Sequence, residues 1–269
     1  MGGLLLLEIE EVKEAQEVKP ELQYVDDSAA AFRAAAGHFV AAARDAVAAR
    51  GVFRVALAGG STPKGMYALL AADPLLRNAV AWDKIQFYWG DERHVPPTHS
   101  DSNYKMATDA MLSKVPVAPS QIHRVLSENP DAAAAAAAYE REVLEGFGGA
   151  PGSVPRFDLV LLGMGPDGHT ASLFPGTKAL EETQKLVVSN WVGKFYTQRI
   201  TMTARLLNNA AFDLFLVCGD DKAPALKAVM EGPYEPVQLP SQLIQPASGS
   251  LVWMVDQKAA ATLAKAAPA

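Results

Sequence analysis

The chain has 269 residues, of which 49% are hydrophobic and 20% are charged, and its formal net charge is −6 at pH 7. This apolar content is enough for a large buried core, and the length corresponds to roughly one or two domains. The acidic balance, without a dense run of Lys and Arg, argues against nucleic acid or an anionic membrane surface as the main partner. An anionic ligand would therefore need a local site.

The chain begins with an apolar run at 4–7 that is too short to span a bilayer. Acidic residues follow it at once, without the basic segment and small-residue cleavage site of a secretory signal. Cys218 is the only cysteine, so no intramolecular disulfide can form and a reducing compartment is expected. We predict a cytoplasmic protein, with the plastid stroma as the alternative.

Helical patterns at 26–51 and 131–149 alternate with short apolar, β-branched or aromatic runs typical of strands. The expected strands are 53–59, 84–90, 157–163, 185–190, 212–219 and 250–255. This alternation predicts an α/β fold with a mostly parallel sheet that is covered by helices on both faces. The pattern is the same on either side of the Gly- and Pro-rich segment 146–157, which indicates a loop within one domain. We therefore predict a single α/β domain at 21–269 after an N-terminal extension of unknown role at 1–20.

The first polar loop follows the run at 53–59 and reads "GGSTP". Gly60 permits a tight turn, Thr62 is a candidate helix cap, and Pro63 suits the first helical position. Free backbone N–H groups at such a helix start, with the hydroxyls of Ser61 and Thr62, would bind a phosphate. A well-capped helix without a ligand explains the pattern equally well. It is not a Walker A loop, because Met66 stands where the lysine is needed.

The second polar loop begins with Asp91, Glu92 and Arg93 directly after the strand at 84–90. Arginine is suited to bidentate recognition of a phosphate or carboxylate, although a solvated, internally paired turn is the simpler explanation of these three residues. "SDSNY" (100–104) predicts another helix start, with Ser100, Asp101 or Ser102 as its cap.

The third polar loop, "GMGPDGHTASLF", follows the strand at 157–163 and contains GxGxxG at Gly163, Gly165 and Gly168, followed by a helix-forming stretch. A dinucleotide site needs a helix start that accepts pyrophosphate and an acid at the end of the next strand. Here the charge of Asp167 would oppose pyrophosphate, and 185–190 ends in Ser and Asn. We interpret the GxGxxG match as accidental.

Asp167 and His169, two residues apart in this turn, form a candidate catalytic pair. A carboxylate bonded to one imidazole nitrogen fixes the tautomer and leaves the other nitrogen to take a proton from water. A lone histidine near a helix start is more often structural, but the glycines and the adjacent acid favour catalysis. No HxH, HExxH, CxxC or GxSxG pattern is present, so we predict no metal and no acyl-enzyme.

Taken together, these motifs resemble those of the 6-phosphogluconolactonases. The matching segments, in order, are "GGSTP", "DERHVP", "SDSNY", "GMGPDGHTASLFPG", "RITMT" (199–203), "NNAA" (208–211) and "GDDKA" (219–223). The resemblance runs from about residue 27 to residue 256, and its Asp-Gly-His block is highly specific. Ala58 stands where Ser is common and Ser241 where Ala is usual, and neither touches the proposed chemistry.

The resemblance implies a Rossmann-like α/β fold and hydrolysis of 6-phospho-D-glucono-1,5-lactone, in the oxidative pentose phosphate pathway, without cofactor or metal. It implies His169 as general base, oriented by Asp167. The implied residues for substrate and phosphate are Gly60, Ser61, Thr62, Asp91, Arg93, Arg199 and Lys222. The expected partner is the sugar-phosphate lactone, with no nucleic acid or membrane, for a monomer or small homo-oligomer.

Two other functions compete with the lactonase. Glucosamine-6-phosphate deaminases share the implied fold and would also use an Asp and a His after the same strand, but the "DERHVP" and "DGHTASLFPG" blocks resemble the lactonase versions. A non-enzymatic sugar-phosphate sensor would need a DNA-binding module, and the roughly 25 residues before the first long helix leave no room for a helix-turn-helix.

Overall fold

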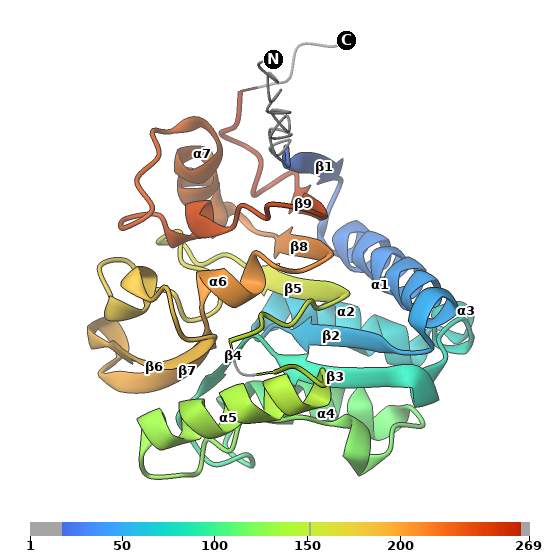
Figure 1. The fold of residues 1–269 in the computed structure, drawn as a ribbon. Coiled ribbons are helices and arrows are strands. Elements are labelled where there is room, and N and C mark those ends of the chain that lie inside the picture. Colours follow the sequence, from blue (N-terminus) through green and yellow to red (C-terminus); the bar gives the residue numbers. More distant parts are fainter. Residues whose placement is uncertain (1–17, 151, 265–269) are drawn as a thin grey trace, which may run out of the picture.

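The computed structural model describes residues 18–150 and 152–264. Its six-stranded main sheet has the order β1 (Glu21–Val25), β9 (Ser250–Asp256), β8 (Phe212–Val217), β5 (Leu159–Gly163), β2 (Phe53–Leu57) and β3 (Ile85–Trp89), and every neighbouring pair is parallel (Figure 1). The predicted Rossmann-like α/β class, with a mostly parallel sheet, is confirmed. Strands from both sides of 146–157 contribute to this sheet, while residues 1–17 lie outside the described residues.

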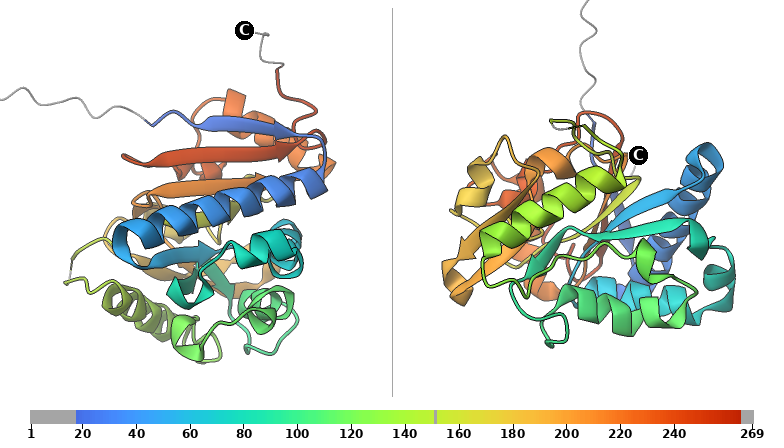
Figure 2. Two further views of the ribbon diagram at one scale, coloured as in Figure 1. Left: turned by 90° about the vertical axis from the view of Figure 1, so that its right-hand side faces the viewer. Right: turned by 60° about the horizontal axis from the view of Figure 1, so that its bottom comes forward.

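Helices cover both faces of the main sheet. One face packs against α1 (Ser28–Arg50), α2 (Ser61–Ala72) and α4 (Asn103–Ala110), with α3 (Pro74–Asn78) beside α2. The other packs against α5 (Ala132–Gly146), α6 (Ala204–Leu207) and α7 (Ala223–Glu231). Figure 2 shows α1 lying across its face of the sheet. Both faces are therefore removed from water, as a parallel sheet requires.

Two hydrophobic cores form because successive residues of a strand point to opposite faces. In β5, Leu159 and Leu161 belong to the core under α1 and α2, whereas Val160 and Leu162 belong to the core under α5. All four side chains are buried. A continuous apolar strand is thus needed to fill both cores, which is why this apolar run predicted a strand.

A second sheet of three antiparallel strands adjoins the first. It has the order β4 (Asp91–Arg93), β7 (Thr197–Met202) and β6 (Val187–Val192). The run at 185–190 was expected in the main sheet, and that prediction is wrong. β6 instead pairs with β7 through the short hairpin at 193–196, where Tyr196 adopts a left-handed backbone with φ of 52°. This hairpin places β6 in the small sheet rather than in a parallel crossover.

Side-chain caps mark the starts of α4 and α5, at positions that the sequence predicted. Asp131 accepts hydrogen bonds from the backbone N–H groups of Ala133 and Ala134 at the start of α5. Ser102 accepts one from Lys105 at the start of α4. These caps satisfy N–H groups that lack a partner in the first turn. The two caps therefore set the residues at which the loops before α4 and α5 end.

Candidate active site

The polar loops predicted from the sequence meet at the carboxyl edge of the main sheet. β2, β3, β5 and β8 run parallel, so the loops that follow them leave from one edge. The edge holds a cavity of about 200 Å³ between β2 and β5, where the strand order reverses direction. Such a reversal is where ligands bind in open α/β sheets. Five of the predicted site residues line this cavity: Gly60, Asp91, Arg93, His169 and Lys222.

The start of α2 forms one wall of the site. Gly60, with φ of 98°, is the N-cap residue, and no side chain caps this helix. The expected cap at Thr62 is therefore wrong: Ser61 and Thr62 already lie in the first turn, and Pro63 follows them. Because no side chain occupies the N–H groups of this turn, they are available to an anion. Ser61, Thr62 and Lys222 line a smaller adjoining cavity of about 110 Å³.

Gly59, just before this turn, is required by close packing. A Cβ atom at position 59 would lie 2.0 Å from the Oδ1 atom of Asn103. The Asn103 amide in turn donates to the carbonyl oxygen and to Oδ1 of Asp91, at 2.9 and 3.2 Å. The loop after β2 and the loop after β3 are thus locked together through one asparagine that the sequence argument did not single out.

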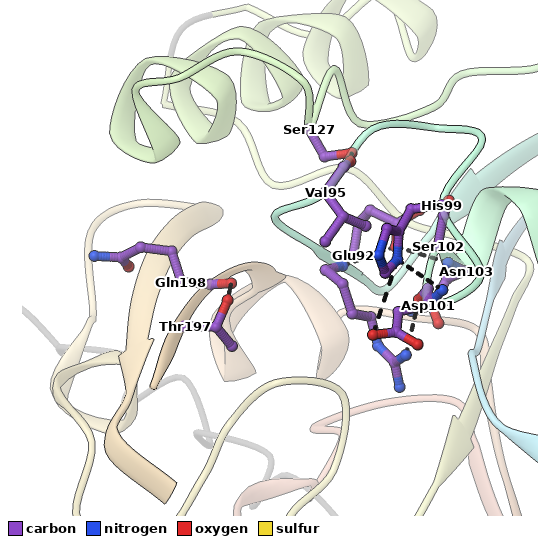
Figure 3. Close-up of polar contacts among 10 residues, drawn as sticks. Glu92, Val95, His99, Asp101, Ser102, Asn103, Ser127, Thr197 and Gln198 are labelled. Atoms are coloured by element: carbon purple, nitrogen blue, oxygen red, sulfur yellow. Dashed lines mark hydrogen bonds and ion pairs between the residues drawn. The ribbon is translucent and has the colours of Figure 1, made fainter. Parts of the chain in front are cut away.

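Asp91 and Glu92 play different parts although they are adjacent. The buried Glu92 carboxylate accepts hydrogen bonds from the backbone N–H groups of Asn103 and Tyr104 and from the Ser102 hydroxyl, at 2.7, 2.8 and 3.0 Å (Figure 3). Burial raises the pKa of Glu92, although these N–H groups oppose the shift. Glu92 therefore holds α4 against β4 and does not face the cavity.

The Asp91 carboxylate reaches the cavity with fixed geometry. Its Oδ2 atom accepts a hydrogen bond of 2.6 Å from the Ser172 hydroxyl, and its Oδ1 atom accepts the one from Asn103. An anionic oxygen would repel a phosphate but would accept a hydrogen bond from a sugar hydroxyl. This chemistry fits the sugar part of a substrate.

Arg93 and Arg199 bring two positive charges to the same face of the small sheet. They are direct partners across the β4–β7 pair. The Nε atom of each is buried without a hydrogen-bond partner among the described residues, and Arg93 uses Nη1 to donate to the carbonyl oxygen of Asp101 at 2.8 Å. Burial, followed by the charge of Arg93, lowers the pKa of Arg199. Arg93 lines the cavity. Arg199, although predicted for the site, is not among the lining residues, and its guanidinium lies 5.5 Å from the centroid of the Phe195 ring.

The loop after β5 forms a turn and not the expected helix. Gly165 donates its N–H to the carbonyl oxygen of His169 at 2.8 Å, which closes the turn around Asp167. Gly168 has φ of 75°, and Ala171 has φ of 47°, a conformation that is unfavourable for a residue with a Cβ. The next helical element is the short 3-10 segment Lys178–Glu181. The helix-forming residues after His169 are instead used to bend the chain around the cavity.

His169 and Asp167 are brought together as the sequence predicted. The Nδ1 atom of His169 is hydrogen-bonded to Oδ1 of Asp167. Burial alone would raise the pKa of Asp167, but the hydrogen bond and charge of His169, together with Lys194, outweigh it and hold that pKa well below the usual range. Asp167 is therefore ionised at neutral pH and favours the tautomer with the proton on Nδ1. The Nε2 lone pair of the neutral ring is then free to accept a proton.

Two further residues that the sequence argument gave no role fix this pair. Lys194, from the β6–β7 hairpin, lies with Nζ 3.0 Å from Oδ2 of Asp167. Phe174 stacks on the His169 ring, with 3.9 Å between centroids and 22° between planes. Lys194 is 27 residues from Asp167 along the chain. The sequence could not indicate this contact, because the hairpin reaches the turn only through the packing of the small sheet.

Lys222 is the last of the predicted site residues, and Cys218 also lines the smaller cavity. Lys222 ends the 3-10 segment Asp220–Lys222 and lines both cavities, with Nζ 2.8 Å from a carboxylate oxygen of Asp221. Burial raises the pKa of Cys218 to about 12, so this thiol is not a nucleophile at neutral pH.

Residues 18–150 and 152–264 contain no cluster of three or more His, Cys, Asp or Glu side chains placed to hold a metal ion. In the same residues, no helix is both long enough and apolar enough to cross a membrane.

Comparison with known proteins identifies the family of this chain. Residues 26–253 match the family model of glucosamine-6-phosphate isomerases/6-phosphogluconolactonase. The chain belongs to this family, as its motifs predicted. A relative from Nostoc sp., named 6-phosphogluconolactonase, is 44% identical over 219 residues, which are 81% of this chain and 88% of the relative. A relative from Arabidopsis thaliana, named 6-phosphogluconolactonase 3, chloroplastic, is 38% identical over 226 residues, 80% of this chain and 66% of the relative.

Solved structures of the family share the fold. The 6-phosphogluconolactonase from Trypanosoma cruzi superposes with a TM-score of 0.79 at 28% identity, covering 92% of this chain and 98% of that one. A monomeric glucosamine-6-phosphate deaminase superposes with a TM-score of 0.74 at 19% identity, covering 90% of this chain and 99% of that one. At 19% identity, the similarity to the deaminase shows a shared fold only.

Proposed function

We propose that this protein hydrolyses 6-phospho-D-glucono-1,5-lactone to 6-phospho-D-gluconate, the reaction after which its relatives are named. The observation that supports this most is the His169–Asp167 pair, because His169 lines a cavity that is also lined by Asp91, Arg93 and Lys222. A general base and a cationic anion site within one cavity are what a lactone with a remote phosphate requires.

The phosphate is proposed to bind between the start of α2 and the cations. The backbone N–H groups of Ser61 and Thr62 would donate to its oxygens, with Lys222 and Arg93 supplying the charge. The unpartnered Nε atoms of Arg93 and Arg199 support this, since a buried guanidinium requires an acceptor. Binding the remote phosphate would position C1 of the lactone near His169. Asp91 would accept a hydrogen bond from a ring hydroxyl.

Hydrolysis would then take two steps. The Nε2 atom of His169 removes a proton from water as the water oxygen attacks C1, which forms a tetrahedral intermediate and an imidazolium. The intermediate collapses with cleavage of the bond between C1 and the ring oxygen, and the imidazolium returns the proton to that oxygen. Asp167, kept ionised by His169 and Lys194, stabilises the imidazolium between the two steps.

The direct test is turnover of the lactone, generated in situ and followed by coupled NADP reduction, against a blank without enzyme. His169→Ala should lower kcat by about 10²- to 10⁴-fold with little change in KM. His99→Ala is the matched control, because His99 is exposed and does not line the cavity. If wild type only matches the blank, the lactonase proposal fails.

The phosphate assignment has its own test. Arg93→Ala should raise KM for the phosphorylated lactone by about 10- to 100-fold and leave KM for plain gluconolactone nearly unchanged. An unchanged preference for the phosphorylated lactone would remove Arg93 from the phosphate site. Release of ammonia from glucosamine 6-phosphate would instead favour the deaminase, and binding of 6-phosphogluconate without turnover of the lactone would favour a sensor.

A further inference from the structure

A second and larger cavity lies away from the proposed active site, at the β1–β9 edge of the main sheet. It measures about 560 Å³ and is lined by residues of α7, β9, the 3-10 segment Pro240–Leu243 and the segment that leads into β1. Figure 1 shows α7, β9 and β1 at the same end of the fold. None of the residues of the catalytic cavity lines it. Its volume is that of a site for a small organic molecule.

The lining of this second cavity is amphipathic. Four apolar side chains lie at its wall, each at most 9% exposed: Val229, Ile244, Leu251 and Trp253. Tyr234 is 61% exposed, and Lys19 is the one charged residue among the described residues that line the cavity. Apolar walls would bind an apolar body, and the lysine complements a negative charge.

The same cavity is connected to the catalytic turn through the segment 239–242. Ser241 and Gln242 line the cavity. The backbone N–H of Ser241 donates at 2.9 Å to the carbonyl oxygen of Gly168, the residue between Asp167 and His169. The Leu239 side chain packs so closely on Gly168 that a Cβ there would lie 2.8 Å from Leu239 Cδ2. One short segment thus touches the cavity on one side and the catalytic turn on the other.

The segment 239–242 is also held rigidly. The Gln242 amide donates to the carbonyl oxygens of Val229 and Pro233, at 3.2 and 3.0 Å, and its oxygen accepts the N–H of Glu235 at 2.7 Å. Both polar atoms of the Gln242 side chain are therefore hydrogen-bonded to the backbone of the cavity wall. A ligand that displaced this wall would therefore act on Ser241 and, through its hydrogen bond, on Gly168.

We propose that this second cavity binds a small amphiphile with an apolar body and one negative charge, and that its occupancy changes the turnover rate at the catalytic turn. The binding part of this proposal stands on the cavity alone, whereas the change in turnover rests on the proposed lactonase function.

Binding is tested with 8-anilinonaphthalene-1-sulfonate, an apolar fluorophore with a single negative charge. Wild type should bind it with enhanced fluorescence, and octanoate should displace it better than neutral 1-octanol. Ala247→Trp, which places an indole at the exposed mouth, should weaken binding at least tenfold, and Lys19→Gln about two- to fivefold. Ala49→Trp, on the exposed side of α1, is the matched control and should bind like wild type.

Several outcomes would overturn the binding proposal. They are no binding to wild type, equal binding by Ala247→Trp, and displacement by octanol that equals displacement by octanoate. A variant that lacks residues 1–17 should keep the same affinity. A tenfold gain in affinity on their removal would mean that the chain's own N-terminal residues compete for the cavity, which contradicts the proposed occupant.

The effect on turnover is tested by measuring kcat for the lactone at saturating octanoate. A change of at least about twofold is expected in wild type and in Ala49→Trp, and none in Ala247→Trp. An unchanged wild-type kcat would refute the coupling. If no variant hydrolyses the lactone, the proposed function fails, while the fluorescence result still decides whether the cavity binds the amphiphile.

Discussion

Gly165 lies directly against the imidazole ring of His169: a Cβ atom at position 165 would be 2.0 Å from both Nδ1 and Cε1 of that ring. The ring also stacks on Phe174. The imidazole is thus in close contact with a bare backbone and an aromatic ring, with Asp167 in hydrogen-bond contact at Nδ1. Glycine is needed at position 165 because a side chain would collide with the ring. Its backbone conformation does not require glycine, since its φ is not in the left-handed region.

Gly165→Ala should therefore displace the His169 ring and lower kcat by about 10²-fold or more, because misplacing a general base by about 1 Å has this effect. Gly37→Ala, in α1 and away from the cavity, is the control, since a Cβ there meets no atom within 4 Å. Steady-state kinetics of both variants check this. Equal kcat values would show that the ring does not need its present position.

Lys194→Met should have a smaller effect. The Lys194 side chain is half-exposed, so its ion pair with Asp167 stabilises the catalytic arrangement by about 1 kcal/mol at most. Its loss should therefore lower kcat less than tenfold. Lys194→Arg should restore most of the activity by keeping the charge. Lys227→Met is the control, because Lys227 is equally exposed and pairs with Glu231 at 3.7 Å on α7. A loss of kcat in both methionine variants would indicate a general effect of removing surface charge.

Ser241→Ala and Ser172→Ala should change stability in opposite directions. Both serines are 1% exposed, but the Ser241 hydroxyl has no hydrogen-bond partner among the described residues, whereas that of Ser172 donates to Asp91. Removing an unsatisfied buried hydroxyl should stabilise the protein by about 1 kcal/mol, and breaking the Asp91 contact should destabilise it by about 1–3 kcal/mol. Urea unfolding measures both. A destabilised Ser241→Ala would mean that its hydroxyl has a partner, such as a buried water.

Asp213→Asn should make stability less dependent on pH. Burial raises the pKa of Asp213 well above its usual value, only partly opposed by Arg156, and neither carboxylate oxygen has a hydrogen-bond partner among the described residues. The unfolded chain therefore loses this proton first, so wild-type stability falls as the pH rises above about 4 towards the folded-state pKa, by at most about 1.4 kcal/mol per pH unit.

The Asp213→Asn variant should thus gain in unfolding free energy relative to wild type between pH 5 and pH 8, measured by urea denaturation at both values. Asp45→Asn, at an exposed position on α1, should show no such gain. A difference for Asp213→Asn that does not change with pH would mean that this carboxyl ionises in the folded state as it does in the unfolded chain.

The main sheet and much of the site could be predicted because their signals are local. The apolar runs of β2, β3, β5, β8 and β9 are long enough to be recognised, and parallel strands necessarily bring their following loops to one edge. Two predictions failed for a tertiary reason. The residues at 185–190 form β6 in the small antiparallel sheet, and those after His169 bend around the cavity as a turn.

By itself, the sequence determined the fold class, the family and the proximity of Asp167 to His169, since apolar spacing, motif order and a separation of two residues all act locally. Only the tertiary structure decided that Lys194 pairs with Asp167, that Arg93 lies beside Arg199, and that Ser241 contacts Gly168. Each of these contacts joins residues that are distant along the chain. They form because the packing of the two sheets and the 239–242 segment, rather than local backbone preference, brings those residues together.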